Sequence, residues 1–138
     1  AYRLASGIYA RRCRKGDISS CKSAGDIQKN NLNQPAKANG YDRKVVRGYL
    51  KRCKKGEHRW CLYLASLYGN SMNKPSQAFT YYTLACKNNV RTACSQAARY
   101  AHRLSLHTKE LAYYKLGCTN KDKYMCRQVK RFNRAHRP

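Results

Sequence analysis

The sequence predicts an all-α protein, an α/α solenoid of about four helical hairpins that are each clipped by one disulfide. One spacing occurs four times: a tyrosine, three residues, a cysteine, seven residues and a second cysteine. Successive copies begin about 32 to 40 residues apart, a period typical of stacked helical hairpins. The four copies use all eight cysteines, and they are Tyr9/Cys13/Cys21, Tyr49/Cys53/Cys61, Tyr82/Cys86/Cys94 and Tyr114/Cys118/Cys126.

Apolar residues at helical spacing predict eight helices within a single domain over residues 1–138. The first is marked by Leu4 and Ile8. A polar stretch that ends at Pro35 predicts the longest loop, and Gly69 is expected to end the fourth helix. Pro75 opens the fifth helix, and Thr108 is the expected N-cap of the seventh. The predicted helices contain residues 2–15, 18–28, 41–55, 58–69, 75–86, 93–101, 108–118 and 125–132, and a basic end follows over residues 131–138.

The cysteine spacing favours structural disulfides over metal or redox chemistry. Zinc sites usually use C-x2-4-C and redox enzymes use C-x-x-C, and neither motif occurs. The histidines do not accompany the cysteine pairs, and His102 and His107 lie five apart, off a common helical face. We therefore expect no metal site and no cofactor.

Each cysteine pair spans a predicted turn between two helices. In every copy the first cysteine lies in the last turn of one helix and the second lies near the start of the next. Two antiparallel helices joined so closely can bring the Cα atoms to the roughly 5.5 Å that a disulfide needs. A disulfide that closes a loop this small stabilises the folded protein by about 2 to 3 kcal/mol. We therefore expect an oxidising compartment: the periplasm, the extracellular space or, as the alternative, the mitochondrial intermembrane space.

The charge of the chain predicts an acidic partner. Thirty Lys and Arg residues against six Asp and Glu give a formal net charge of +24. Two basic stripes at helical spacing are candidate anion-binding surfaces; the bland alternative is a solvated positive face that binds nothing. The stripes contain Lys44, Arg47, Lys51 and Lys55, and Arg127, Lys130, Arg131 and Arg134. No stretch approaches eighteen consecutive apolar residues, so we expect no membrane span.

The residues resemble a known repeat family. Residues 78–86, followed by Ala93 and Cys94, resemble the A-x-x-Y-Y-x-x-A-C core of Sel1-like repeats, and residues 113–118 repeat its second half. The paired cysteines make the chain most similar to the disulfide-bridged, cysteine-rich Sel1-like proteins known from Helicobacter and, in a smaller branch, from the mitochondrial intermembrane space. That branch is associated with assembly of respiratory complexes, so the resemblance implies a subunit or assembly role in a larger complex.

Three functions follow as hypotheses. The first is a non-catalytic protein-binding or scaffold module, because stacked hairpins expose a surface for a partner protein. The alternative is a subunit that associates with nucleic acid in an RNA-rich assembly. The third is β-lactam binding or hydrolysis, which the resemblance implies for some relatives and which the Ser71-x-x-Lys74 motif matches. That motif lies in a predicted loop, and neither Ser-Asp-Asn nor Lys-Thr-Gly accompanies it, so we expect no enzyme.

Overall fold

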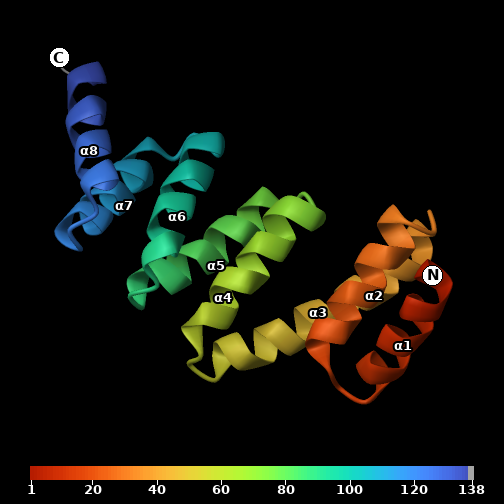
Figure 1. The fold of residues 1–138 in the computed structure, drawn as a ribbon. Coiled ribbons are helices and arrows are strands. Elements are labelled where there is room, and N and C mark those ends of the chain that lie inside the picture. Colours follow the sequence, from red (N-terminus) through yellow and green to blue (C-terminus); the bar gives the residue numbers. More distant parts are fainter. Residues whose placement is uncertain (137–138) are drawn as a thin grey trace. The chain divides into compact units, whose positions relative to one another are not determined.

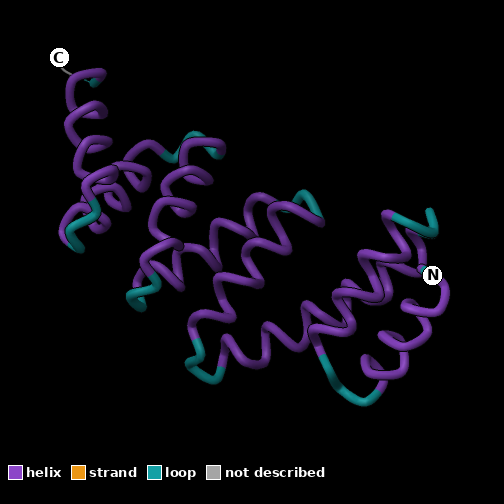
Figure 2. Tube along the Cα trace, in the orientation of Figure 1, coloured by secondary structure: helices purple, strands orange, loops and turns teal. Residues whose placement is uncertain are grey.

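The computed structural model describes residues 1–136, which form helices joined by short loops (Figures 1 and 2). It contains eight α-helices, one short π-helix and, among the residues described, no strand. The elements are α1 (Tyr2–Arg14), α2 (Ile18–Asn30), α3 (Pro35–Lys54), α4 (His58–Ser66), η1 (Leu67–Ser71), α5 (Pro75–Lys87), α6 (Arg91–Arg103), α7 (His107–Thr119) and α8 (Lys123–Ala135). The last two residues of the predicted basic end, 137 and 138, lie outside the described residues.

The chain separates into two compact units, unit 1 (Ala1–Lys51) and unit 2 (Arg52–Pro138). Within unit 1, α1 packs along α2, and α2 meets α3 where Gly48 lies against the side chain of Ile18. Within unit 2, each helix from α4 to α8 packs against the next one along the chain. Helices adjacent in sequence are therefore adjacent in space within each unit, as hairpin repeats require.

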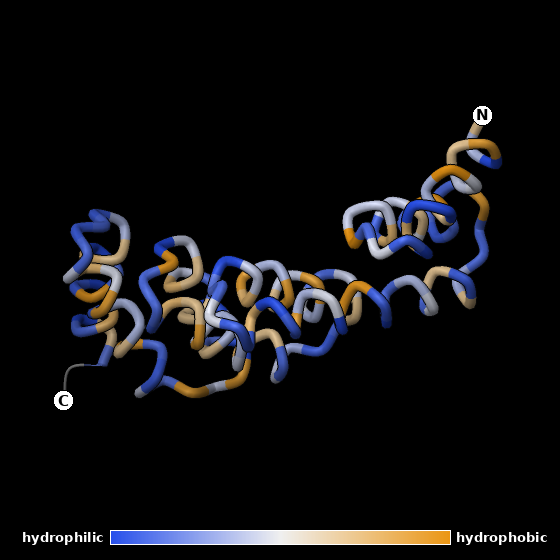
Figure 3. Tube along the Cα trace, turned by 90° about the horizontal axis from the view of Figure 1, so that it is seen from below, coloured by the Kyte–Doolittle hydropathy of each residue, from blue (hydrophilic) through white to orange (hydrophobic). Residues whose placement is uncertain are grey.

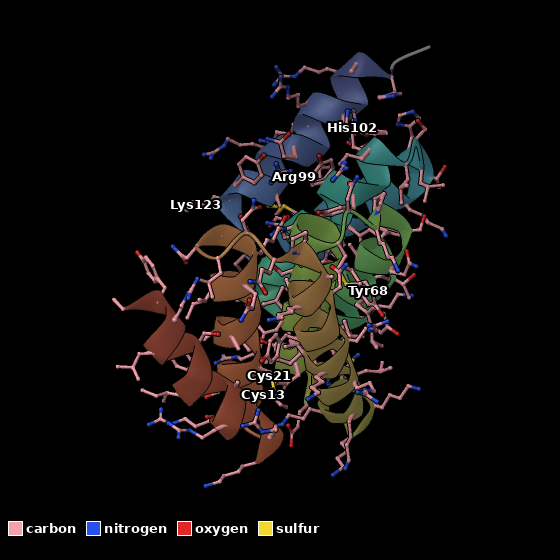
Figure 4. All side chains as sticks on the ribbon, turned by 90° about the vertical axis from the view of Figure 1, so that its right-hand side faces the viewer. Cys13, Cys21, Tyr68, Arg99, His102 and Lys123 are labelled. Carbon is pink, nitrogen blue, oxygen red and sulfur yellow. A yellow bond between two sulfur atoms is a disulfide. The ribbon has the colours of Figure 1, made fainter. Side chains whose placement is uncertain are left out.

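Four disulfides join helices that follow each other in sequence. In each, the first cysteine lies in the last turn of one helix, and the second is the fourth residue of the next helix. The Cα atoms of the bonded cysteines lie 4.5 to 4.8 Å apart. Figure 4 shows the first bridge, between Cys13 and Cys21. The other bridges are Cys53–Cys61, Cys86–Cys94 and Cys118–Cys126, and all four are consistent with an oxidising compartment.

The four disulfide-bridged turns share one backbone conformation. The third residue after each first cysteine has a positive φ, and the N–H of the following residue donates to a carbonyl five residues earlier. These are the features of a Schellman C-cap, which satisfies the last carbonyls of the helix. Glycine suits the left-handed position best, but only two of the four turns have it. The left-handed residues are Gly16 (φ 97°), Gly56 (φ 94°), Asn89 (φ 68°) and Lys121 (φ 67°).

Three predicted helix boundaries were wrong. Helix α3 begins at Pro35, six residues before the predicted start, because proline suits the first position of a helix and the polar loop is correspondingly short. Helix α7 begins at His107, so Thr108 is not its N-cap. Gly69 does not end α4 with a positive φ; it lies within η1, where its missing side chain makes room for the Tyr100 hydroxyl.

The core of unit 2 is built from small residues, cysteines and tyrosines. Tyr82 and Tyr100 stack with ring centroids 5.4 Å apart, and Gly117 lies against Met125. Of the tyrosines that precede the cysteines, Tyr82 and Tyr49 are buried, as expected, whereas Tyr9 and Tyr114 are partly exposed. The buried cluster of unit 2 contains Cys53, Cys61, Ala65, Ala78, Tyr82, Ala85, Cys86, Ala93, Cys94, Ala97, Ala98, Tyr100, Tyr113 and Met125.

Unit 1 has a smaller and more polar interior. The Gln28 side-chain amide donates to the Ser6 hydroxyl at 2.8 Å, and both side chains are buried. On α1, Leu4 is 72% exposed and Ile8 is 36% exposed, so neither residue that marked the first helix is buried in a core. Hydrophilic residues recur along the whole described chain (Figure 3), and none of its helices combines the length and apolarity needed to cross a membrane.

Candidate functional site

All eight side chains of the predicted basic stripes are exposed. Three of the first stripe lie on α3 in unit 1, at i, i+3 and i+7, and therefore share one helical face. Lys55 follows α3 in the disulfide turn, where it belongs to unit 2. The second stripe lies on α8 in unit 2. Each stripe is therefore a candidate surface by itself.

Few carboxylates neutralise these cations. Within residues 1–136, the only ion pair between a Lys or Arg side chain and a carboxylate joins Lys22 to Asp26 on α2, at 3.0 Å. The stripe residues take part in no ion pair within this range. Their charges consequently face solvent and remain free to attract an anion over about a Debye length, roughly 8 Å at physiological salt.

A cleft that the sequence did not predict lies in unit 2. It has a volume of about 560 Å³ and contains Arg99 and Arg103 from α6 together with Tyr114 and Tyr124. Figure 4 marks Arg99 and His102 on α6. Tyr124 is 52% exposed, so its ring is accessible from solvent. Two guanidinium groups and an accessible ring can hold a planar anion.

The signal for this cleft was present in the sequence. Arg99 and Arg103 are four residues apart on one helix and so lie on the same face. Tyr124 is far from both in sequence, so only tertiary packing reveals that an aromatic ring joins them.

A second cleft in unit 2 brings titratable side chains together. It has a volume of about 400 Å³ and is lined by His102, His107, Glu110, Tyr114 and Arg131, among others. The ring of His136, which also lines the cleft, stacks on Phe132 with centroids 4.0 Å apart. Its Nδ1 lies 2.9 Å from the Phe132 carbonyl oxygen, so this nitrogen carries the proton and donates.

The two histidines meet because they belong to different helices. His102 is in the last turn of α6, and His107 is the first residue of α7. Between them Ser105 takes a positive φ of 58°, which reverses the chain within three residues. The argument from a single helical face therefore does not apply to this pair.

Glu110 is the buried centre of this cleft. Only 6% of the residue is exposed, and its Oε2 lies 3.3 Å from His102 Nδ1 and 3.4 Å from His107 Nδ1. The Tyr114 hydroxyl donates to Oε1 at 3.2 Å. Burial, followed by the negative charge of Glu110, raises the pKa of Tyr114 to about 12, so this hydroxyl stays protonated and remains a donor at neutral pH.

The Ser-x-x-Lys motif lies outside both clefts. Ser71 is the last residue of η1, and Lys74 precedes the first residue of α5. Both are exposed. The serine therefore does not open a helix that carries the lysine, which is the arrangement that the motif needs.

Comparison with known proteins adds no assignment: no family model, no curated protein and no solved structure matches this chain.

Proposed function

We propose that this protein is a non-catalytic protein-binding or scaffold module that holds an acidic partner on its basic helices, as a subunit or assembly factor of a larger complex. The observation that carries the proposal is that all eight stripe cations are exposed and take part in no ion pair within residues 1–136. Such surfaces gain affinity and fast association from an acidic partner.

The repeated local structure supports a solenoid of the Sel1-like, disulfide-clipped type as the scaffold. Ala78 and Ala85, which carry the Sel1-like pattern, are fully buried, and small residues at such places let neighbouring helices approach closely. We also propose that residues 1–138 form one such solenoid domain. The localisation that we propose is the periplasm or the extracellular space, with the mitochondrial intermembrane space as the alternative.

Charge reversal tests the proposal directly. The test variant replaces Arg127, Lys130 and Arg134 of α8 with glutamate. The matched control replaces Lys37, Arg59 and Lys74, which are also exposed and lie at or near helix starts, where glutamate is well tolerated. Fluorescence anisotropy with an Asp- and Glu-rich peptide is expected to show weakened binding for the α8 variant only. Equal loss in both variants would contradict a specific surface and leave only general attraction.

The accessible Tyr124 beside Arg99 and Arg103 favours nucleic acid as the second candidate. Base stacking on an aromatic side chain is worth about 1–3 kcal/mol per base. Tyr124→Ala should therefore weaken the binding of a single-stranded oligonucleotide by about 5- to 150-fold and leave the affinity for the acidic peptide unchanged. If an oligonucleotide of equal net charge binds the unmodified protein more tightly than the peptide, the nucleic-acid reading replaces the protein-binding one.

A further inference from the structure

We propose that His102, His107 and Glu110 form a Zn²⁺ site in unit 2, a function separate from binding by the basic stripes. The three residues each offer one ligand atom, and these atoms all lie within 4.8 Å of one another. Two imidazoles and one carboxylate are a ligand set that zinc uses, with water or another ligand in the fourth position.

The two separations from Glu110 match those between ligand atoms of a shared metal ion, and the three ligand atoms lie within 4.8 Å of one another. In a tetrahedral Zn²⁺ site with bonds of about 2.0–2.2 Å, neighbouring ligand atoms lie about 3.3–3.6 Å apart. The separations from Glu110 Oε2 are 3.3 Å to His102 Nδ1 and 3.4 Å to His107 Nδ1. A good N–H···O hydrogen bond spans about 2.7–3.2 Å, so both separations are long for that interaction.

The burial pattern also fits a metal site. The side chain of Glu110 is 7% exposed and is therefore fixed, whereas those of His102 and His107 are 68% and 54% exposed. The carboxylate consequently serves as the anchored ligand, and the two rings can rotate to complete the site. Burying a carboxylate is costly, and a bound dication would offset that cost.

Tyr114 supplies the outer-shell support that metal ligands usually have. Its hydroxyl donates to Glu110 Oε1, which leaves Oε2 directed to the two histidines. Such partners orient ligating carboxylates, and their loss typically weakens metal binding by about 10- to 100-fold. Tyr114 is therefore a positioning residue, not a ligand.

One charge opposes the site. Arg131 lines the same cleft, and its guanidinium repels a cation. The same arginine belongs to the α8 stripe that we propose for an acidic partner. Arg131→Gln should therefore move the two activities in opposite directions, with tighter zinc binding and weaker peptide binding.

The experiment uses the oxidised full chain, freed of metal with EDTA, and titrates it with ZnCl₂ by isothermal titration calorimetry at pH 7. One Zn²⁺ is expected per chain. His102→Ala, His107→Ala and Glu110→Gln should each weaken binding by at least about 100-fold, more than an outer-shell loss, and Tyr114→Phe by about 10-fold. His58→Ala, a histidine on α4 outside the cleft, is the matched control and should leave the affinity unchanged.

Circular dichroism and the intact mass of the oxidised variants establish that each is folded with four disulfides. The two histidine variants test the site even if Glu110→Gln fails to fold, because both rings are exposed. The absence of zinc binding in the unmodified chain would overturn the proposal. So would binding that persists when both His102 and His107 are replaced, or that is lost equally in His58→Ala.

Discussion

The interior of unit 1 includes a buried hydrogen bond between Ser6 and Gln28, whereas that of unit 2 is a continuous cluster of alanine, cysteine, tyrosine and methionine. Both units nevertheless contain the same kind of disulfide-bridged turn, with a residue of positive φ three positions after the first cysteine. The turn therefore does not depend on the packing around it. The helices of unit 1, with less apolar burial, are correspondingly more dependent on their disulfide.

Removing one disulfide from each unit should give the largest effect. Replacing Cys13 and Cys21, or Cys86 and Cys94, with alanine opens loops of equal length, so each pair should lower the free energy of unfolding by about 2.5 kcal/mol. We expect loss of the first pair to remove hydrogen-exchange protection from α1 and α2 selectively, because fewer buried apolar residues hold them than hold the helices of unit 2. Loss of the second pair should lower hydrogen-exchange protection in unit 2 without unfolding its helices. The same loss of protection in both variants would contradict the comparison.

The buried polar pair of unit 1 gives the next effect. Ser6→Ala leaves the buried Gln28 amide without its acceptor, which should cost about 1–3 kcal/mol in urea unfolding. Adding Gln28→Leu should recover most of that loss, because it removes the buried amide, whose Oε1 has no hydrogen-bond partner even in the unmodified chain. Ser19→Ala, an exposed serine on α2, is the control and should have little effect. A double variant less stable than Ser6→Ala would show that packing, not hydrogen bonding, determines this site.

Substitutions at the positive-φ residue of the turns should either lower or raise the free energy of unfolding, depending on whether they remove or introduce glycine. Gly56→Ala places a side chain at φ 94° and should cost about 1 kcal/mol, whereas Lys121→Gly relieves φ 67° and should raise the free energy of unfolding by about 0.5–1 kcal/mol. Gly40→Ala is the control: it lies inside α3, where nothing crowds an added Cβ, and alanine should stabilise that helix. Thermal unfolding measures all three. A loss on Lys121→Gly would mean that the lysine side chain makes a contact that outweighs the strain.

The smallest effect concerns pH and belongs to unit 2. The folded protein holds the Tyr114 proton more tightly than the unfolded chain, because burial raises the pKa of Tyr114 from its ordinary value of 10.0 to about 12. Its contribution to stability is therefore fully present below about pH 10 and is lost as the pH rises towards 12. Urea unfolding at several alkaline pH values should show this decline, and Tyr114→Phe should make it shallower. An unchanged slope in that variant would assign the decline to other groups.

Most of the fold could be predicted from the sequence, because helices and disulfide turns depend on residues close together in the chain. The exceptions have identifiable causes. Pro35 is the first residue of α3, whereas the sequence pattern predicted that this helix begins only at residue 41. Gly69 has the identity of a C-cap but serves a contact with Tyr100, a residue 31 positions away. Leu4 has the spacing of a core residue and is exposed.

The candidate sites could be predicted only in part. The basic stripes follow from helical spacing, and their residues are exposed as expected. The cleft around Tyr124 and the His102, His107 and Glu110 cluster combine residues from different helices, so spacing along one helix could not find them.

By itself the sequence determined the helices, the pairing of the cysteines and the excess of positive charge, because each depends on residue identity and short spacing. Only the tertiary structure decided that Glu110 is buried beside two histidines and that unit 1 buries a polar pair, Ser6 and Gln28. The physical reason is that burial and side-chain proximity are set by how helices pack. The net free energy of folding is a small difference between large opposing terms, contributed by many residues far apart in the chain.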